Sequence, residues 1–169
     1  MIILETKRLI LRQLAPEDAE FIRELLNEPA FIQNIGDKGV RTIDDARMYI
    51  LSGPMASYAQ FGFGLYRVEL KETGEPIGIC GLLKRDSLED VDIGFAFLEK
   101  FWAKGFAYES AAAVMEYGRG VLKIPRIVAI TSPDNEGSIR VLRKIGLRFE
   151  KMIRMPGSTD DTRLFVPIA

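Results

Sequence analysis

The chain has 169 residues, a formal net charge of −1 and 47% hydrophobic residues, a composition typical of a globular protein with one full core. The small net charge argues against a nucleic-acid binder held by a general basic field. One cysteine and no histidine exclude an internal disulfide, a cysteine cage for zinc and every nucleophilic dyad that needs histidine. We therefore expect a single domain over residues 1–169, without a metal, that works through carboxylates, hydroxyls, lysine, backbone amides or water.

The N-terminal segment and the lengths of the apolar runs bear on the cellular location of the protein. Charged residues interrupt the apolar N-terminus at Glu5, Lys7 and Arg8, so this segment does not have the pattern of a signal peptide. No stretch approaches about 18 uncharged apolar residues, the length that spans a membrane. We expect a cytoplasmic protein whose partners are neither nucleic acid nor membrane.

The first part of the chain predicts one strand and two helices. Residues 6–14 have the pattern of a strand, and residues 15–27 have that of a helix with one apolar face. Thr42 is a candidate cap for a second helix over residues 43–51. The Ser-Gly-Pro sequence at 52–54 is expected to break that helix.

The middle of the chain predicts a hairpin and then a strand–helix–strand unit. Two strand patterns, residues 61–69 and 77–85, flank a turn that contains glycine and proline. The next strand, residues 91–98, leads to an alanine-rich helix over residues 106–120 and then to the apolar strand 126–131. Such a βαβ unit must be parallel and right-handed, and its uniformly apolar second strand is expected to be buried on both faces.

The last part of the chain predicts one helix and two strands. The helix begins near residue 134 and ends at Gly146, a typical C-terminal cap, and the strands follow at 147–155 and 162–168. The fold class that follows is α+β. We expect a mixed, mostly antiparallel twisted sheet of about six to seven strands, with one parallel βαβ unit and helices on both faces.

The connection that precedes the alanine-rich helix has features of an anion site. The sequence Phe-Trp-Ala-Lys-Gly-Phe-Ala at 101–107 delivers the chain to a helix N-terminus, whose unpaired N–H groups and partial positive charge suit a phosphate. Gly105 and Ala107 leave the backbone accessible, and Lys104 adds a cation. Taken alone, Gly105 is better explained as a turn residue, because the chain has neither a P-loop nor a dinucleotide fingerprint.

A second motif opens the last predicted helix. Asn135 and Ser138 lie one helical turn apart and share a face. The simpler alternative is that Asn135 only caps the helix. Arg140, Arg143 and Lys144 follow and could complement phosphates, although exposed helix cations usually face water.

Together, the two motifs resemble the GNAT superfamily of acyl-CoA N-acyltransferases. The cofactor motif of that family reads Gln/Arg-x-x-Gly-x-Gly/Ala, followed by Asn-x-x-Ala/Ser at the start of the helix after the next strand. Here Trp102 stands where the family usually has Gln or Arg, while the glycine and alanine positions match. Nearly the whole chain looks like the branch that contains the ribosomal-protein N-terminal alanine acetyltransferases. The matching segments are residues 5–22, 74–82, 92–118 and 135–150.

The resemblance implies an acetyl-CoA site between the strands at 91–98 and 126–131. The backbone of the first strand would hydrogen-bond the pantetheine arm like an added strand, and the amides of the following loop would hold the pyrophosphate. Asn135 would meet the pantetheine arm at the catalytic centre, and Ser138 would lie near the sulfur. The expected cofactor-binding residues are Phe95, Ala96, Phe97, Leu98, Trp102, Ala103, Lys104, Gly105, Phe106, Ala107, Asn135, Ser138 and Arg143.

The implied chemistry is acyl transfer to a primary amine, either a protein N-terminus or a small molecule. Ser138 would stabilise the departing thiolate as an acid or hydrogen-bond donor. Many family members use a tyrosine for this, but the matching position here is Leu142. Asp92 is a candidate base, since burial would raise its pKa, but it is about as consistent with a structural pairing to an arginine. Glu109 fits a structural role at the helix start, and a water relay without a base is a third option.

The sequence says less about the acceptor and about the oligomeric state. The acceptor site would be built from residues 28–60 and the loop 155–162. An alternative function is a non-catalytic acyl-CoA-binding sensor or interaction module, because Trp102 departs from the motif and no base is obvious. A nucleotide-binding protein of another class is a further alternative that the missing glycine motifs disfavour. The family suggests a monomer or a homodimer.

Overall fold

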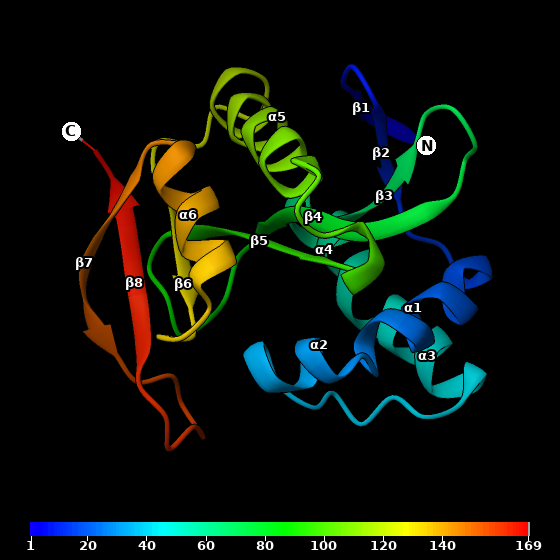
Figure 1. The fold of residues 1–169 in the computed structure, drawn as a ribbon, viewed down its shortest axis with the longest axis horizontal. Coiled ribbons are helices and arrows are strands. Elements are labelled where there is room, and N and C mark those ends of the chain that lie inside the picture. Colours follow the sequence, from blue (N-terminus) through cyan, green and yellow to red (C-terminus); the bar gives the residue numbers. More distant parts are fainter. Residues whose placement is uncertain (169) are drawn as a thin grey trace.

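A computed structural model describes residues 1–168 and contains one eight-stranded sheet in the order β1-β2-β3-β4-β5-β6-β8-β7 (Figure 1). Neighbouring strands are antiparallel except β5 and β6, which are parallel. The mixed, mostly antiparallel sheet with one parallel βαβ unit is therefore confirmed, with eight strands rather than six to seven. The strands are β1 Ile2–Glu5, β2 Leu9–Gln13, β3 Leu65–Leu70, β4 Pro76–Leu83, β5 Val91–Phe97, β6 Ile127–Thr131, β7 Leu147–Ile153 and β8 Thr162–Pro167.

Helices cover both faces of the sheet, as predicted (Figure 1). Side chains of α5 and α6 join one buried cluster, and those of α1, α2 and α3 join the other. The alternation of side chains along β5 supplies both clusters, because Ile93 and Phe97 belong to the first whereas Ala96 and Leu98 belong to the second. The α-helices are α1 Ala19–Leu26, α2 Pro29–Asn34, α3 Ile43–Ile50, α4 Ala56–Phe61, α5 Phe106–Gly120 and α6 Glu136–Lys144.

The additional strand lies at the N-terminus. The sequence pattern predicts one strand over residues 6–14, but the structure has β1 and β2 as an antiparallel pair. The polar residues between them form the turn, in which the backbone N–H of Thr6 donates to the carbonyl of Leu9 at 2.9 Å. Thr6 and Arg8 also bind Glu109 on α5, more than 100 residues away in sequence. A contact of that range leaves no local signal, so the turn could not be predicted from the pattern alone.

The predicted start of α3 is confirmed, but the predicted break after it is wrong. Thr42 Oγ1 accepts a hydrogen bond from the backbone N–H of Asp45 at 3.0 Å, which is the expected cap. At Ser-Gly-Pro the helix changes to one wider π-type turn over Leu51–Met55 and continues into α4. Pro54 lacks an N–H and cannot join a regular α-helical ladder, and the wider turn accommodates it.

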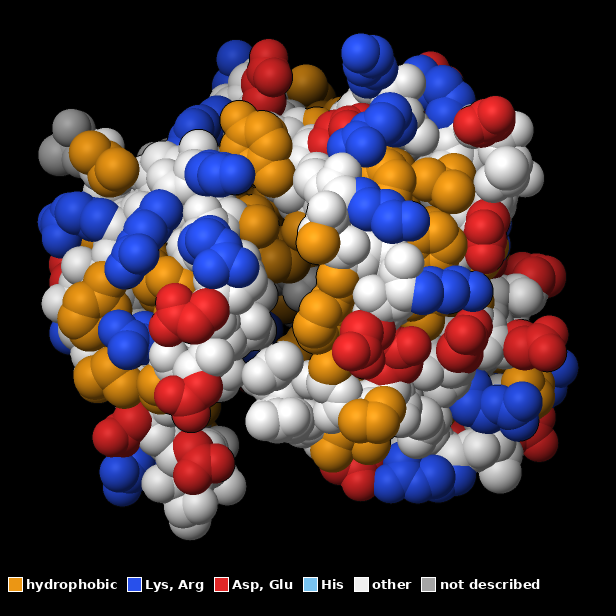
Figure 2. All heavy atoms as spheres, viewed as in Figure 1, with side chains coloured by type: hydrophobic (Ala, Val, Ile, Leu, Met, Phe, Trp, Pro, Cys, Tyr) orange, Lys and Arg blue, Asp and Glu red, His pale blue; other side chains and the backbone are white. Residues whose placement is uncertain are grey.

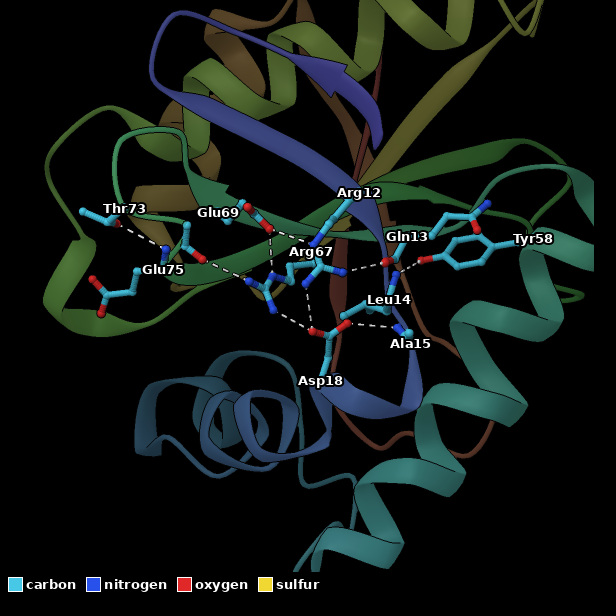
Figure 3. A network of polar contacts seen from close by, with 11 residues as sticks. Arg12, Gln13, Leu14, Ala15, Asp18, Tyr58, Arg67, Glu69, Thr73 and Glu75 are labelled. Carbon is cyan, nitrogen blue, oxygen red and sulfur yellow. Dashed lines mark hydrogen bonds and ion pairs between the residues drawn. The ribbon is translucent and has the colours of Figure 1, made fainter. Parts of the chain in front are cut away.

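A buried ion-pair network joins the start of α1 to β2 and β3 (Figure 3). Asp18, which is 4% exposed, accepts from Arg67 at 2.6 Å and from Arg12 at 3.2 Å, and its other oxygen accepts from the backbone N–H of Ala15. Glu69 binds both arginines from the other side. Because every charge in the network has a partner, the network holds the start of α1 against β2 and β3.

Candidate active site

The candidate site begins where two neighbouring strands separate. β5 and β6 pair at two positions, the second of which joins Asp92 to Val128. Beyond this point β5 stays paired with β4, and β6 with β8, so the strands diverge toward their carboxyl ends (Figure 1). Figure 2 shows a hollow between the part formed by α6, β7 and β8 and the part formed by α1 and α2, with hydrophobic side chains on its floor.

The edge of β5 presents backbone groups to this opening. The N–H of Leu98 donates to the carbonyl of Ile77 on β4 at 2.9 Å. In an antiparallel pair, alternate residues bond to the same neighbour, so Ala96 and Leu98 direct their backbone groups to β4. Phe95 and Phe97 direct theirs to the side of β6, where the strands have parted.

The loop after β5 ends at an uncapped helix start. Ala103 and Gly105 have positive φ angles of 61° and 83°, and α5 begins at Phe106 without a side-chain cap. The first amides of such a helix have no acceptor within the helix. Lys104 lies beside the loop, with its ammonium nitrogen 5.9 Å from the ring centre of Phe101. The carboxyl edge of the opening is thus lined with backbone donors and a nearby cation.

Trp102, at the departure from the family motif, bonds back to β5. Its indole Nε1 donates to the carbonyl oxygen of Phe97 at 2.9 Å. The residue is 46% exposed, although most tryptophans are largely buried. The indole therefore occupies one of the carbonyls that face the opening.

Glu109 is fully engaged in a structural contact. Thr6 Oγ1 donates to it at 2.5 Å, and Arg8 donates from its backbone N–H at 2.9 Å and from Nε at 2.7 Å. Burial alone would raise the pKa of Glu109, but these hydrogen bonds together lower it. The guanidinium of Arg8 also lies 4.3 Å from the ring centre of Phe106. The N-terminal hairpin is thereby fastened to the first turn of α5.

The start of α6 brings together the second pair of predicted residues. Asn135 is the N-cap, and its Oδ1 accepts from the backbone N–H of Ser138 at 3.3 Å. The capping alternative is therefore correct as a description of Asn135, and it also fixes where the half-buried Ser138 lies. Leu142 is buried in the core, whereas Arg143 is exposed.

One hydroxyl near this helix was not indicated by the sequence pattern. Ser132, directly after β6, has a buried Oγ that finds no hydrogen-bond partner within the described residues. A lone serine after a strand carries no local signal for such a position.

Asp92 lies at the last paired position before the strands part, and it is 1% exposed. Arg85 Nε donates to its two carboxylate oxygens at 3.1 and 3.3 Å. Burial raises the pKa of Asp92 to about 6, although Arg85 acts in the opposite direction. The pairing with an arginine is therefore confirmed, and the raised pKa leaves Asp92 a candidate base.

A cavity of about 270 Å³ adjoins β5 on its α3 side. Its wall includes Leu65 and Leu83, and a Cβ on Gly94 would lie 3.8 and 3.4 Å from these two side chains. The missing side chain of Gly94 therefore keeps the β5 backbone close to the cavity. Other lining residues come from α3, α4 and the turn between them, within the segment 28–60 expected to hold the acceptor. A larger groove of about 600 Å³ lies between α5 and α6 and shares no residue with this cavity.

Arg85 also connects Asp92 to groups that the sequence did not single out. Desolvation lowers the pKa of Lys38 and the charge of Arg85 adds to this shift, whereas Arg85 opposes the rise that burial causes in the pKa of Tyr49. These side chains come from the connection between α2 and α3, from α3 and from the connection between β4 and β5. Only the tertiary fold brings them together.

Two negative findings apply to the described part of the chain, residues 1–168. None of its helices has both the length and the apolar character needed to cross a bilayer. No group of three or more histidine, cysteine, aspartate or glutamate side chains is arranged there to hold a metal ion.

Comparison with known proteins gives one family. A family model described as an acetyltransferase (GNAT) domain matches residues 8–148. The uncharacterized N-acetyltransferase YoaA of Bacillus subtilis is 31% identical over 169 residues, which cover 96% of this chain and 94% of that protein. The uncharacterized protein YkkB of the same bacterium is 35% identical over 96 residues, and this match spans 56% of each chain.

Solved structures share the whole fold. An acetyltransferase of the GNAT family from Bacillus anthracis superposes with a TM-score of 0.81 at 28% identity, covering 98% of this chain and 97% of that one. RimL, the ribosomal L7/L12 α-N-protein acetyltransferase, solved in complex with coenzyme A, gives a TM-score of 0.84 at 19% identity, over 99% and 98% of the two chains.

Proposed function

The chain belongs to the GNAT acetyltransferase family, and from this we propose that it transfers an acetyl group from acetyl-CoA to a primary amine. The observation that carries the proposal is the separation of β5 from β6 next to the uncapped start of α5. This arrangement offers an edge strand and a cluster of backbone donors at one opening. The acceptor is either a protein N-terminus or a small molecule.

The residues of the opening suit the chemical groups of acetyl-CoA. This cofactor would supply a thioester that the amine attacks to form the N–C bond of the product, after which the C–S bond breaks and CoA leaves as a thiolate. Phe95 and Phe97 offer backbone donors and acceptors to the amides of the pantetheine arm, as an edge strand does to an added strand. The loop with Ala103, Lys104 and Gly105 and the first amides of α5 suit a diphosphate.

Asp92 is the proposed base on the acceptor side. An ammonium group must lose a proton before it can attack, and a carboxylate with a pKa of about 6 is mostly ionised at neutral pH and can accept that proton, directly or through water. Glu109 is less suited, because Thr6 and Arg8 occupy its oxygens. Arg85 holds the Asp92 carboxylate in place from one side.

Asn135 and Ser138 are the proposed residues on the thiolate side. Asn135 fixes the first turn of α6 through its bond to the Ser138 amide, and the Ser138 hydroxyl can donate to a developing thiolate. The backbone N–H groups of β5 that face the opening are the proposed donors to the oxyanion.

A second candidate function is acyl-CoA binding without catalysis. It is favoured by the Trp102 indole, which occupies the Phe97 carbonyl, and by the arginine partner of Asp92. Both functions predict that acetyl-CoA binds, and only the first predicts turnover.

An assay of free thiol release tests the proposal. Wild-type protein is incubated with acetyl-CoA and amines of three classes: peptides with free N-termini, polyamines and small amino compounds. Amine-dependent release of CoA, lost in Ser138→Ala or Asp92→Asn, supports the enzyme and its assigned residues. Binding of acetyl-CoA without turnover of any amine would favour the second candidate.

A further inference from the structure

The cavity beside β5 has an unusual charge for a site that receives an amine. Its lining is apolar or neutral except for Lys84, and no lining residue is acidic. The Lys84 ammonium donates to the backbone carbonyls of Arg85 and Leu88 at 2.9 and 2.8 Å, so its partners are neutral. An ammonium-rich acceptor would therefore meet a positive charge in this cavity.

Further cationic side chains lie near Lys84. Arg85 follows Lys84 directly, and its charge reaches Lys38 and the cavity residue Tyr49. Of these three cations Lys84 lines the cavity itself, Arg85 adjoins it in sequence, and Lys38 lies close enough to Arg85 to be affected by its charge.

Acidic side chains near Lys38, Lys84 and Arg85 neutralise only part of the positive charge of these three residues. The buried Asp92 pairs with Arg85. In the loop that follows, Asp90 pairs with Arg126, and no ion pair found within residues 1–168 joins the exposed Asp86 or Glu89 to the three cations. A negative charge on a ligand would find unbalanced positive charge here.

We propose that the acceptor is a small amine that also carries an anionic group, a carboxylate or a phosphate, and that Lys38, Lys84 and Arg85 bind this group. This inference rests on the proposed acetyltransferase function. The cavity volume of about 270 Å³ lies just below the roughly 300–1,000 Å³ typical of drug-sized ligands, so it suits a molecule of amino-acid size.

Binding of the anion also has a consequence for the proton transfer. Arg85 lowers the pKa of Asp92, and an anionic group that shares Arg85 weakens this effect. Asp92 then becomes a stronger base when the acceptor is in place. An acceptor without the anionic group leaves Asp92 tied to Arg85.

The test compares acceptors that differ in charge, at low ionic strength and saturating acetyl-CoA. The pairs are an amino acid with its amide, and phosphoethanolamine with ethanolamine, and spermidine represents polycations. We predict at least about a tenfold higher kcat/KM for the member that carries the anionic group than for its partner without it, the ratio that 1.4 kcal/mol gives. The two pairs show whether a carboxylate or a phosphate is recognised.

Two variants and one control test whether Lys38 and Lys84 cause the preference for an acceptor with an anionic group. Lys38→Gln and Lys84→Gln are expected to reduce the preference for the anionic acceptor. Lys38 is in an exposed loop, so its substitution keeps the test valid if the Lys84 variant folds poorly. Lys71→Gln is the matched control, because its ammonium also donates to a backbone carbonyl, that of Thr6, at the far end of β4. That end lies roughly 25 Å away at about 3.3 Å per strand residue.

The outcomes separate this inference from the proposed function. Turnover of the amines without an anionic group, or of spermidine, in preference to the acceptors that carry one overturns the inference and leaves the acetyltransferase intact. A preference for anions that is unchanged in Lys38→Gln and Lys84→Gln also overturns the assigned residues. Failure of acetyl-CoA to bind, measured separately by calorimetry, refutes the proposed function itself.

Discussion

The indole Nε1 of Trp102 donates a hydrogen bond to the carbonyl oxygen of Phe97 at 2.9 Å, at the β5 edge of the opening between β5 and β6. The same carbonyl is one that a pantetheine amide would use if the arm bound as an added strand. Cofactor and indole therefore compete for one acceptor, and we expect the indole to move when acetyl-CoA binds.

Trp102 is the only tryptophan in the chain, so its fluorescence reports on this site alone. We predict a saturable change in emission on titration with acetyl-CoA. Trp102→Gln restores a residue usual in the family and frees the Phe97 carbonyl, and calorimetry should show binding about two- to tenfold tighter, since one hydrogen bond contributes about 0.5–1.5 kcal/mol. Weaker binding in this variant would show that the indole is part of the cofactor site.

The pH dependence of turnover tests Asp92. With a pKa of about 6, its ionised form increases as pH rises through 6, and kcat/KM should rise over the same range. Arg85→Gln removes a partner that lowers this pKa, so the midpoint should move to higher pH. Asp92→Asn should reduce kcat/KM by about 10²–10⁴-fold and abolish this limb of the profile. An unshifted midpoint in Arg85→Gln would contradict the assignment.

Ser138→Ala tests the thiolate side. Loss of a hydrogen bond to a charged group costs about 1.5–3 kcal/mol, and we expect kcat to fall roughly 10–100-fold with little change in acetyl-CoA affinity. Ser132→Ala is the control, since it removes a nearby hydroxyl that no described residue binds. Equal losses in the two variants would indicate general damage at this edge of the sheet.

The contact of Glu109 with Thr6 and Arg8 predicts a pH-dependent stability. The pKa of Glu109 is lowered in the folded protein, so its contribution is present above the ordinary value of 4.5 and is lost as pH falls below it. Urea unfolding should show Glu109→Gln to be less stable than wild type at pH 7, and this difference should shrink near pH 4. A constant difference would mean that the carboxylate charge is not what stabilises the contact.

The features that sequence predicts best are local ones. The Thr42 cap, the alanine-rich helix that became α5 and the positive φ of Gly146 depend on residues a few positions apart. The loop at 101–107 and the pair Asn135–Ser138 were found because each motif is contiguous. The strand β1 was missed because the turn after it depends on a contact with distant Glu109.

The residues around the cavity proposed to hold the acceptor could not be predicted from contiguous motifs. Lys38, Tyr49 and Arg85 are far apart in sequence and none belongs to a recognisable motif. The expected break at residues 52–54 was wrong because the helix absorbs Pro54 in a wider turn rather than ending. The walls of the cavity therefore became visible only in the folded chain.

We propose that acetyl-CoA binds in the opening between β5 and β6, beside the start of α5, and calorimetric titration of the folded protein measures this binding. We predict saturable binding by the wild type, weakened about tenfold, or 1.4 kcal/mol, in Lys104→Glu, because Lys104 belongs to the loop proposed to hold the pyrophosphate. The control Lys151→Glu, at an exposed position on β7, should bind like the wild type. Absence of binding by the folded wild type, or equal affinities in all three proteins, would contradict the account.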